Sequence, residues 1–473
     1  MIYSARWDSM SAGDLDRIHD GALHVLDHVG VAVMDADLRA QLAAAGAHVT
    51  DETVHLSRQL VEDALAQAPR DLRFYDRRGG SFTLARGSRL LACTGDGLNT
   101  LDHDSGDVRQ PTLDDVALFA RLADALPDIT ILRGIPMVPA EPEGLAGQLL
   151  ATGVLLQNST KHYFTSPLGL EIAQAWVDLA ETLNGGVSLA ERPIFSALIT
   201  PTSPLQLGDE DAAKLKLLAR KKVPIIATSA PMAGATSPYT LAGTLVLQNA
   251  ENLFLITAIQ VIQPGAPVML GPVSAILDMP TGSLTYASPE YFLFHLASLD
   301  LADRYGLPGY HPLAHTDAAS LDYQAGIERG LSMQLLYSAG APVIGGAGSY
   351  HKTNIVSLEQ LVIDVEMYQM VAHFFKGFPL DDDSLSLDEI ERVGPGGNFL
   401  LEERTLRYFR SGMHFLPKVF NRNLRPKARS ILDRAHSYRL ELLKDYAPAV
   451  PAETAAAIQR YVDERAPSLG LAA

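Results

Sequence analysis

A strand-and-helix alternation recurs eight times between Arg89 and Phe375, and it limits the possible folds more than any other feature of the chain. Each β-rich run is followed by a longer segment of helical periodicity. The runs occupy residues 90–94, 131–134, 162–165, 194–200, 223–228, 268–271, 307–311 and 342–345. Because each run is continuously apolar, it suits a strand buried on both faces of a parallel sheet. Eight βα units predict an α/β protein built on a closed (β/α)8 TIM barrel.

The chain divides into three predicted regions. Residues 1–87 contain helical patterns at about 11–30, 37–45 and 57–68, and then a hairpin formed by 72–75 and 81–85. Residues 88–378 form the barrel, in which Thr112 and Asp115 make a capping box at the start of a helix. Residues 379–473 form a C-terminal extension with helices near 402–409, 426–444 and 452–464.

Composition narrows the function classes. The net charge of −17 argues against a nucleic-acid partner, which requires a basic surface. The longest apolar segment, 241–262, carries several polar residues, so we expect a buried helix and no membrane partner. A cytoplasmic location is expected, and the single cysteine agrees with a reducing compartment. That residue, Cys93, is predicted to be a buried, inert part of the first barrel strand.

Catalytic residues of TIM barrels lie at the C-terminal ends of the strands, and several histidines fall there. His162 opens the third strand, His311 and His315 follow the seventh, and His351 follows the eighth. These positions suggest a shared site, although a histidine at a strand end can also be purely structural. A metal site built from His311, His315 and Asp317 is the alternative, but their spacing matches no known ligand pattern. The sequence also has no GxxxxGK[ST], HExxH or CxxC motif, and no GxGxxG opens a helix after a strand.

Aromatic residues are predicted at the same rim, namely Tyr163, Phe164, Tyr310 and Tyr350. They could simply pack the barrel mouth. Alternatively, they could form a cage for a cationic ligand, in which each ring face contributes about 0.5–2 kcal/mol.

Five segments resemble the trimethylamine methyltransferase (MttB-like) family. They are 234–251, 286–290 (Tyr-Ala-Ser-Pro-Glu), 322–326 (Asp-Tyr-Gln-Ala-Gly), 393–397 (Val-Gly-Pro-Gly-Gly) and 405–410 (Thr-Leu-Arg-Tyr-Phe-Arg). The resemblance covers nearly the whole chain in the same order. It implies a (β/α)8 barrel that moves a methyl group from a methylated amine to the Co(I) of a corrinoid held by a separate small protein.

The chain departs from the archaeal trimethylamine enzymes of this family, which carry pyrrolysine in the barrel mouth, because it contains only the twenty ordinary residues. The resemblance implies that the pyrrolysine ring of those enzymes captures an amine through the lone pair of the amine nitrogen. A quaternary ammonium has no lone pair and already leaves as a neutral tertiary amine. The resemblance therefore implies a betaine-type substrate, such as glycine betaine, proline betaine or carnitine.

On this interpretation, His351 and His311 are the expected catalytic residues. The expected substrate-binding residues are Tyr163, Phe164, Tyr310, His315, Tyr350 and Arg133. A histidine, Arg133 or Lys352 would hold the substrate carboxylate. No tightly bound cofactor or metal is expected, because the corrinoid comes with a partner protein that docks over the barrel mouth. A homo-oligomer is possible. The alternatives are a metal-assisted TIM-barrel hydrolase or lyase and a betaine-binding protein without turnover.

Overall fold

The computed structural model describes residues 8–85, 92–133, 139, 141, 143–312, 315–422 and 429–470. Residues 90, 91 and 134 of the predicted strands lie outside the described residues. So does segment 426–428, at the predicted start of a C-terminal helix.

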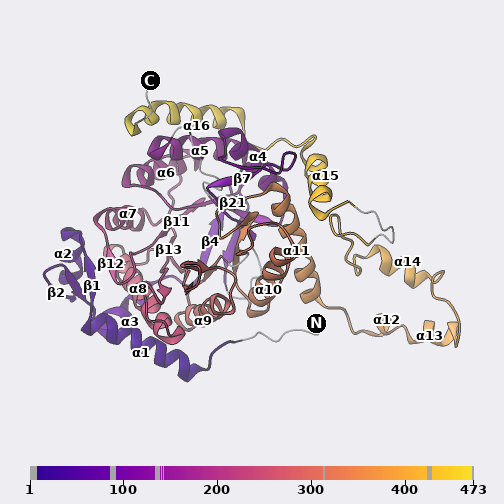
Figure 1. Cartoon of the computed structure of the whole chain (residues 1–473), viewed down its shortest axis with the longest axis horizontal. Coiled ribbons are helices and arrows are strands. Elements are labelled where there is room, and N and C mark those ends of the chain that lie inside the picture. The colour runs from indigo at the N-terminus through magenta and orange to yellow at the C-terminus, as the bar shows by residue number, and fades with distance from the viewer. Residues whose placement is uncertain are drawn as a thin grey trace.

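Eight parallel strands form the centre of the molecule (Figure 1). They are β6 (Ala92–Thr94), β9 (Ile129–Arg133), β10 (His162–Thr165), β11 (Phe195–Ile199), β13 (Ile225–Ala227), β15 (Val268–Leu270), β18 (Tyr310–His311) and β19 (Val343–Ala347). The barrel closes between β15 and β18, where the backbone N–H of Leu270 donates to the carbonyl of Pro308 at 3.0 Å. The predicted (β/α)8 barrel is confirmed, and Cys93 lies in its first strand as expected.

Helices surround the barrel, and four of them begin at a side chain that caps the first turn, namely Thr112, Ser288, Asp322 and Ser357. The surrounding helices are α4 (Leu113–Ala125), α5 (Gly144–Asn158), α6 (Leu170–Leu183), α7 (Asp209–Arg220), α8 (Leu241–Ile262), α9 (Pro289–Tyr305), α10 (Tyr323–Ala339) and α11 (Leu358–Lys376). The predicted capping box of Thr112 and Asp115 is present at α4. Among the described residues, α8 is the one helix long and apolar enough to cross a membrane, and 83% of its apolar window is buried against neighbouring elements.

Inside the barrel, apolar side chains alternate with side chains that point outward to the helices. Cys93, Ile131, Phe164, Ile226, Met269, Tyr310 and Val343 form one buried cluster together with residues of a hairpin. This hairpin, β4 (Leu72–Tyr75) and β5 (Ser81–Leu84), covers the N-terminal ends of the strands, because its Phe74 ring stacks on His162 with 4.4 Å between centroids. The hairpin covers one end of the barrel, which leaves the C-terminal end as the expected side of ligand entry.

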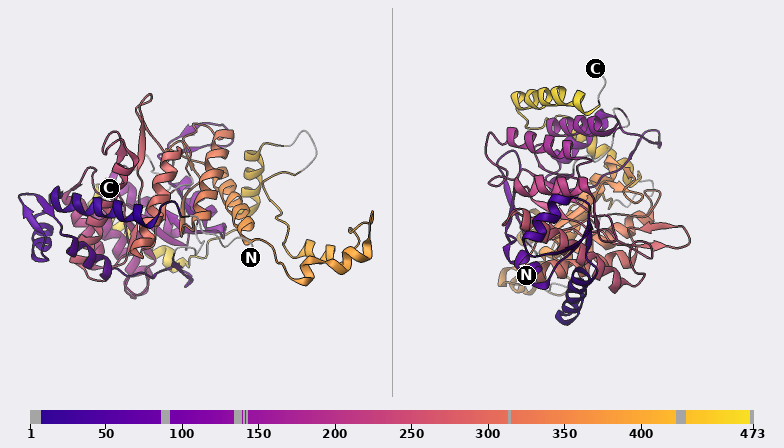
Figure 2. Two further views of the ribbon diagram at one scale, coloured as in Figure 1. Left: turned by 90° about the horizontal axis from the view of Figure 1, so that it is seen from below. Right: turned by 90° about the vertical axis from the view of Figure 1, so that its left-hand side faces the viewer.

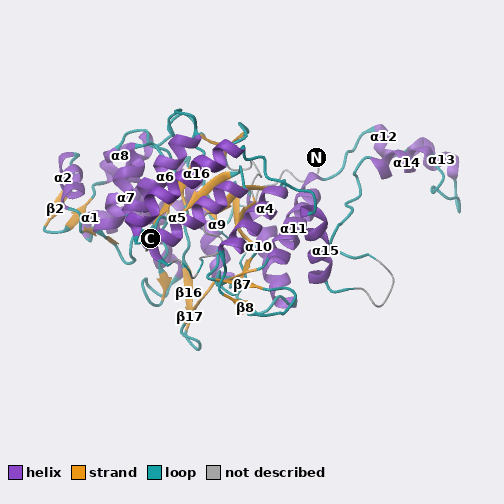
Figure 3. Ribbon diagram, turned by 90° about the horizontal axis from the view of Figure 1, so that it is seen from above, coloured by secondary structure: helices purple, strands orange, loops and turns teal. Residues whose placement is uncertain are grey.

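Two small sheets stand at the open, C-terminal end. One contains β7 (Asn99–Leu101), β8 (Val108–Arg109), β20 (Ser349–Tyr350) and β21 (Ile355–Val356). The other contains β14 (Met232–Ala233), β16 (Ala275–Asp278) and β17 (Ser283–Thr285). Figure 3 shows β7, β8, β16 and β17 projecting on the same side of the molecule. They form the rim of the mouth.

The N-terminal region packs on α8. It contains α1 (Ala12–His28), β1 (Val31–Val33), α2 (Ala36–Ala44), β2 (His48–Thr50), β3 (Thr53–His55) and α3 (Arg58–Gln67). The three strands form a small sheet with β12 (Gln206–Leu207), which the helical periodicity of this region did not predict.

The C-terminal extension has two parts. Helices α15 (Ile431–Leu443) and α16 (Ala452–Arg465) and the short 3-10 helix η1 (Ala466–Leu469) lie against the barrel, α15 on α11 and α16 on α5. Helices α12 (Asp382–Leu385), α13 (Leu387–Val393) and α14 (Glu403–Arg410) instead form an arm that projects away from the body (Figures 1 and 2).

Candidate functional site

Arg133 is the central charged residue of the barrel mouth. It ends β9, where its backbone N–H donates to the Thr94 hydroxyl at 2.9 Å. Its Nη2 lies 3.0 Å from Oδ2 of Asp96, and only 19% of the Arg133 side chain is exposed. Burial alone would lower the pKa of Arg133, but the Asp96 carboxylate, together with the nearby Tyr310, Cys93 and Tyr286, raises that pKa above its ordinary value. The guanidinium therefore stays charged at every relevant pH.

Aromatic rings line the same mouth. The Arg133 guanidinium lies 5.6 Å from the centroid of the Phe164 ring, and Phe164 contacts Tyr310 with 5.0 Å between ring centroids. Tyr310 needs a glycine opposite it, because a Cβ at Gly345 would lie only 2.8 Å from the tyrosine hydroxyl. Burial raises the pKa of Tyr310, so its hydroxyl remains protonated.

A third ring, Tyr286, reaches the site from the loop between β17 and α9. The carboxylate of Asp317 fixes this loop by accepting hydrogen bonds from the backbone N–H groups of Tyr286 and Ala287, at 2.8 and 3.1 Å. The Tyr286 ring meets His315 edge-on, with 5.6 Å between centroids. Burial, followed by the negative charge of Asp96, raises the pKa of Tyr286 above its usual value, although the positive charge of Arg133 acts to lower it.

His315 is buried beside these groups and is neutral. Burial, followed by the positive charges of Arg329 and Arg133, lowers its pKa to about 3. Its Nδ1 lies 3.5 Å from the Ser349 hydroxyl. Without a charge at neutral pH, His315 can offer a hydrogen bond to a ligand but cannot neutralise a carboxylate.

Two predicted site residues point away from the mouth. The Tyr163 hydroxyl lies 3.1 Å from the Thr152 hydroxyl in α5, and its ring packs edge-on against Trp176 of α6. His311 faces α9, where its Nδ1 lies 3.4 Å from Nδ1 of His295. Successive residues of a strand face opposite sides. Because Phe164 and Tyr310 point into the barrel, their neighbours Tyr163 and His311 point outward, and the expectation that these two line the site is wrong.

Tyr350 and His351 lie at the rim. Tyr350 is buried in β20, and burial raises its pKa to about 12. His351, Lys352 and Thr353 form a turn in which all three have positive φ, and His351 is half-buried. The N–H of Lys352 donates to the Thr316 carbonyl at 3.0 Å, and its ammonium donates to the Ser283 hydroxyl. The turn thus joins both small sheets, and a catalytic role for His351 stays a prediction.

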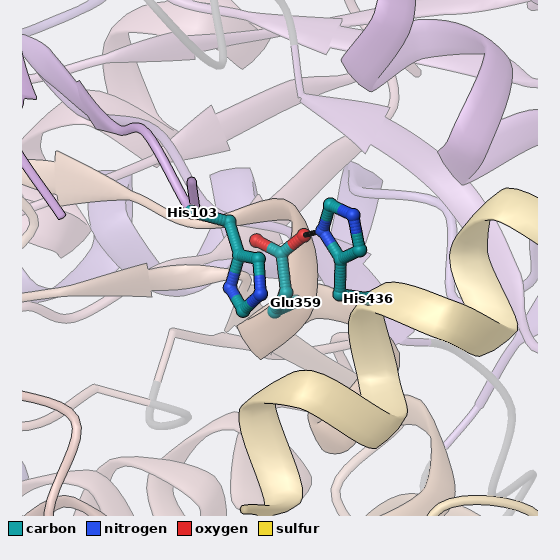
Figure 4. A group of neighbouring side chains, drawn as sticks. All are labelled: His103, Glu359 and His436. Carbon is teal, nitrogen blue, oxygen red and sulfur yellow. Dashed lines mark hydrogen bonds and ion pairs between the residues drawn. The ribbon is translucent and has the colours of Figure 1, made fainter. Parts of the chain in front are cut away.

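The metal site considered from the sequence is not assembled. Asp317 accepts two backbone hydrogen bonds, and His311 lies behind the barrel wall. A different group of potential ligands does meet among the described residues, namely His103, Glu359 and His436 (Figure 4).

The geometry of this second group suits a structural joint better than a metal. The rings of His103 and His436 are stacked at 4.2 Å with 20° between their planes, so their in-plane lone pairs cannot converge on one ion without reorientation. The Arg439 guanidinium already supplies positive charge, with its Nε 3.1 Å from the buried Glu359 carboxylate. His436 Nδ1 lies 3.0 Å from the same carboxylate. These contacts fasten α15 to the start of α11.

Sequence reasoning missed two residues of the mouth, Asp96 and Tyr286. Asp96 stands between two glycines directly after the first strand, and Tyr286 belongs to one of the segments that carry the family resemblance. Both positions held a usable signal, since polar and aromatic residues after a barrel strand are candidates for the site.

Comparison with known proteins assigns the chain to a family. The sequence model described as trimethylamine methyltransferase (MTTB) matches residues 3–470. The chain is 31% identical over 474 residues to the glycine betaine methyltransferase of Desulfitobacterium hafniense (strain Y51), covering 98% of each chain. It is 33% identical over 407 residues to the trimethylamine methyltransferase MttB of Methanosarcina thermophila, covering 83% of each.

The fold also has a solved counterpart. The monomethylamine methyltransferase (MtmB) of Methanosarcina barkeri matches with a TM-score of 0.50 at 12% identity, over 99% of this chain and 96% of that one. At this identity the match shows a shared fold alone. The full-length sequence matches establish more: this chain is a methyltransferase of the trimethylamine methyltransferase (MTTB) family.

Proposed function

We propose that this methyltransferase moves a methyl group from a betaine, a quaternary amine that carries a carboxylate, to the Co(I) of a corrinoid on a separate small protein. The observation that carries the proposal is the Arg133–Asp96 ion pair at 3.0 Å within a mouth lined by aromatic rings. A betaine is a zwitterion, and this site offers one fixed charge of each sign. The full-length similarity to a glycine betaine methyltransferase supports the same substrate class.

Each side chain then has a defined task. Arg133 holds the substrate carboxylate, since a guanidinium has five donors and Asp96 does not use all of them. Asp96 and the rings of Phe164, Tyr286 and Tyr310 face the quaternary ammonium, whose positive charge favours carboxylate and ring faces. Lys352, the other cation considered as the carboxylate anchor, is bonded to Ser283 instead.

The transfer requires no proton donor or acceptor. The substrate methyl carbon accepts an electron pair from Co(I) while its C–N bond breaks, and the nitrogen keeps the pair of that bond. A neutral tertiary amine leaves. The side chains of the mouth therefore act by fixing the methyl group in line with its acceptor, and such orientation can account for several kcal/mol of the barrier.

The corrinoid protein would dock over the open end of the barrel. Large apolar side chains are exposed there on loops that follow the strands, namely Leu98, Leu168, Tyr239 and Met279. Exposed apolar residues grouped at a functional opening favour a protein partner.

The test is a substrate panel assayed with reduced free cobalamin. Glycine betaine, proline betaine or carnitine should convert cob(I)alamin to methylcobalamin in the ultraviolet–visible spectrum, while trimethylamine should react poorly. Reaction with trimethylamine and none with any betaine would refute the proposal. Betaine binding without any methylcobalamin would favour the binding protein without turnover. Stoichiometric zinc or iron by elemental analysis would favour the hydrolase or lyase.

A further inference from the structure

The arm formed by residues 379–412 carries an unusually apolar surface for a segment that extends into solvent. It contains α12, α13 and α14 and stands clear of the body in Figure 1, in the left view of Figure 2 and in Figure 3. Its large exposed apolar side chains are Leu380, Leu385, Leu387, Ile390, Phe399, Leu400, Leu401, Leu406 and Phe409, with exposed fractions from 41% to 95%.

The polar side chains of the arm bond to one another, which holds these helices together without the body. The Asp383 carboxylate accepts hydrogen bonds from Arg407 at 2.6 Å and from the Tyr408 hydroxyl at 2.8 Å. Arg404 of α14 bridges to Asp388 of α13 at 2.8 Å. The arm is therefore a preformed unit in which these charged groups pair with one another, while its apolar side chains remain in solvent.

The root of the arm is anchored. The backbone N–H groups of Val419 and Phe420 donate to the Glu366 carboxylate on α11 at 2.8 and 2.6 Å, and Lys418 donates to the same group. His373, also on α11, contacts the Met413 carbonyl at 3.0 Å. These contacts fix where the arm leaves the body, so its outward direction is built into the structure.

A receiving surface exists on the body of the same chain. The outer face of α10 exposes Tyr323, Ile327 and Leu331, by 92%, 69% and 49%, at the four-residue spacing of one helix face. Gly326 lies on the same face with open space around it. A glycine inside an exposed helix costs about 0.5–1 kcal/mol relative to alanine, and close approach of another backbone would compensate. The end of α11, next to α10, adds exposed Met370, Phe374 and Phe378.

We propose that the arm packs against the outer face of α10 and the end of α11 in a second copy of this chain. One chain carries both halves of the contact, so a two-fold axis lets each copy give one arm and receive the other, and the assembly closes. The occupant is a second copy because the anchored root directs the arm away from its own α10.

The exposed apolar surface of the arm is large enough for a stable assembly. With about 200 Å² for a free large apolar side chain, the exposed fractions give the arm roughly 1,000 Å² of apolar surface. A standard interface needs ~800 Å² from each partner, whereas the largest apolar patch of a monomer is ~300–600 Å². The summed apolar surface of the arm reaches the area that a standard interface takes from each partner.

The first experiment measures the mass in solution by multi-angle light scattering on the full chain at micromolar concentration. The wild type should have at least twice the chain mass of 51.0 kDa. A variant with Leu401→Glu and Phe409→Glu should return to 51.0 kDa, and so should Ile327→Glu on the receiving face. Val29→Glu is the matched control, because Val29 is 57% exposed on the N-terminal region and should leave the mass unchanged. Circular dichroism should show the same fold for all four proteins.

The second experiment identifies the contact. Cys93 is buried, so an introduced cysteine is the accessible thiol of each variant. Chains with Leu401→Cys and chains with Ile327→Cys, carrying different tags, are mixed and treated with a bismaleimide. A cross-link that joins the two tags supports the proposal. A monomeric wild type overturns it, as does an oligomer that survives both sets of glutamate variants. A chain that carries both cysteines serves as the test for an internal contact. If it cross-links within itself while the mixed single variants do not cross-link, the proposal is wrong, and it is also wrong if the chain associates only with an added corrinoid-binding protein.

Discussion

Replacing Arg133 with glutamine tests the proposed carboxylate anchor directly. The side chain is four-fifths buried, so a substrate carboxylate at this position loses water and depends on the guanidinium for compensation. Removing one partner of such a buried charge pair costs about 2–5 kcal/mol. At ~1.4 kcal/mol for each tenfold, kcat/KM for glycine betaine should fall by roughly 30-fold to several thousand-fold.

The assay follows methylcobalamin formation with varied glycine betaine, and the direction of the effect can be separated from a general loss of structure. Choline carries the same trimethylammonium group without a carboxylate, so its affinity, measured by calorimetry, should change much less in Arg133→Gln. Tyr163→Phe is the control on the neighbouring strand. It removes an outward hydroxyl bonded to Thr152 and should leave kcat/KM unchanged, at a cost of ~1 kcal/mol in unfolding free energy.

Either of two results would show that the reasoning about Arg133 is wrong. One is a kcat/KM for glycine betaine in Arg133→Gln that stays within threefold of the wild type. The other is an equal loss of affinity for choline and for glycine betaine, which would mean that the substitution damaged the aromatic mouth and not a carboxylate contact. His351→Ala would then become the next variant to examine.

Three further predictions follow from buried groups. Phe164→Ala should weaken binding of any quaternary ammonium ligand by about 0.5–2 kcal/mol, measured by calorimetry, and should affect choline as much as glycine betaine. Burial lowers the pKa of His162 and His315 from 6.5 to about 3. Between these two pH values, the unfolded chain binds a proton at each histidine and the folded chain does not. Each residue should therefore reduce the unfolding free energy by ~1.4 kcal/mol per pH unit as the pH falls below about 6.5, and His162→Gln should lessen that slope in urea titrations. The Arg329–Asp364 pair, at 2.6 Å and fully buried, should cost about 3–5 kcal/mol when Asp364→Ala leaves the arginine alone, whereas replacing both with leucine should cost less.

The barrel could be predicted because its strands require an unusual sequence pattern. A strand buried on both faces must be apolar at consecutive positions, and the eight runs in this chain satisfy that requirement. The same property hides which residues point inward. In β10, His162, Tyr163, Phe164 and Thr165 are all buried, so polarity cannot distinguish the barrel interior from the helix layer. The errors at Tyr163 and His311 both come from this loss of contrast.

The N-terminal sheet was missed for a different reason. Strands β1, β2 and β3 contain three residues each, too few to show a period of two against the helical pattern around them. Their pairing with β12 depends on a segment more than 150 residues away. Local patterns hold no information about such a contact.

Asp96 illustrates how long-range packing creates the charge balance of the site. An isolated guanidinium inside an apolar mouth would be costly, and the Asp96 carboxylate compensates for it at 3.0 Å. The position of Asp96 beside Arg133 depends on the two glycines that flank Asp96. A Cβ at Gly95 would lie 2.3 Å from the Ser349 hydroxyl, and one at Gly97 would lie 2.9 Å from Val356. Only a loop without these side chains can lie against β20 and β21 and direct Asp96 toward Arg133.

The resulting Arg133–Asp96 pair has no net charge, so a zwitterionic betaine can enter without adding a net charge. A simple ammonium ion would instead leave a positive excess in a poorly solvated site. The glycines of one loop thereby connect the packing of the rim to the substrate class that we propose.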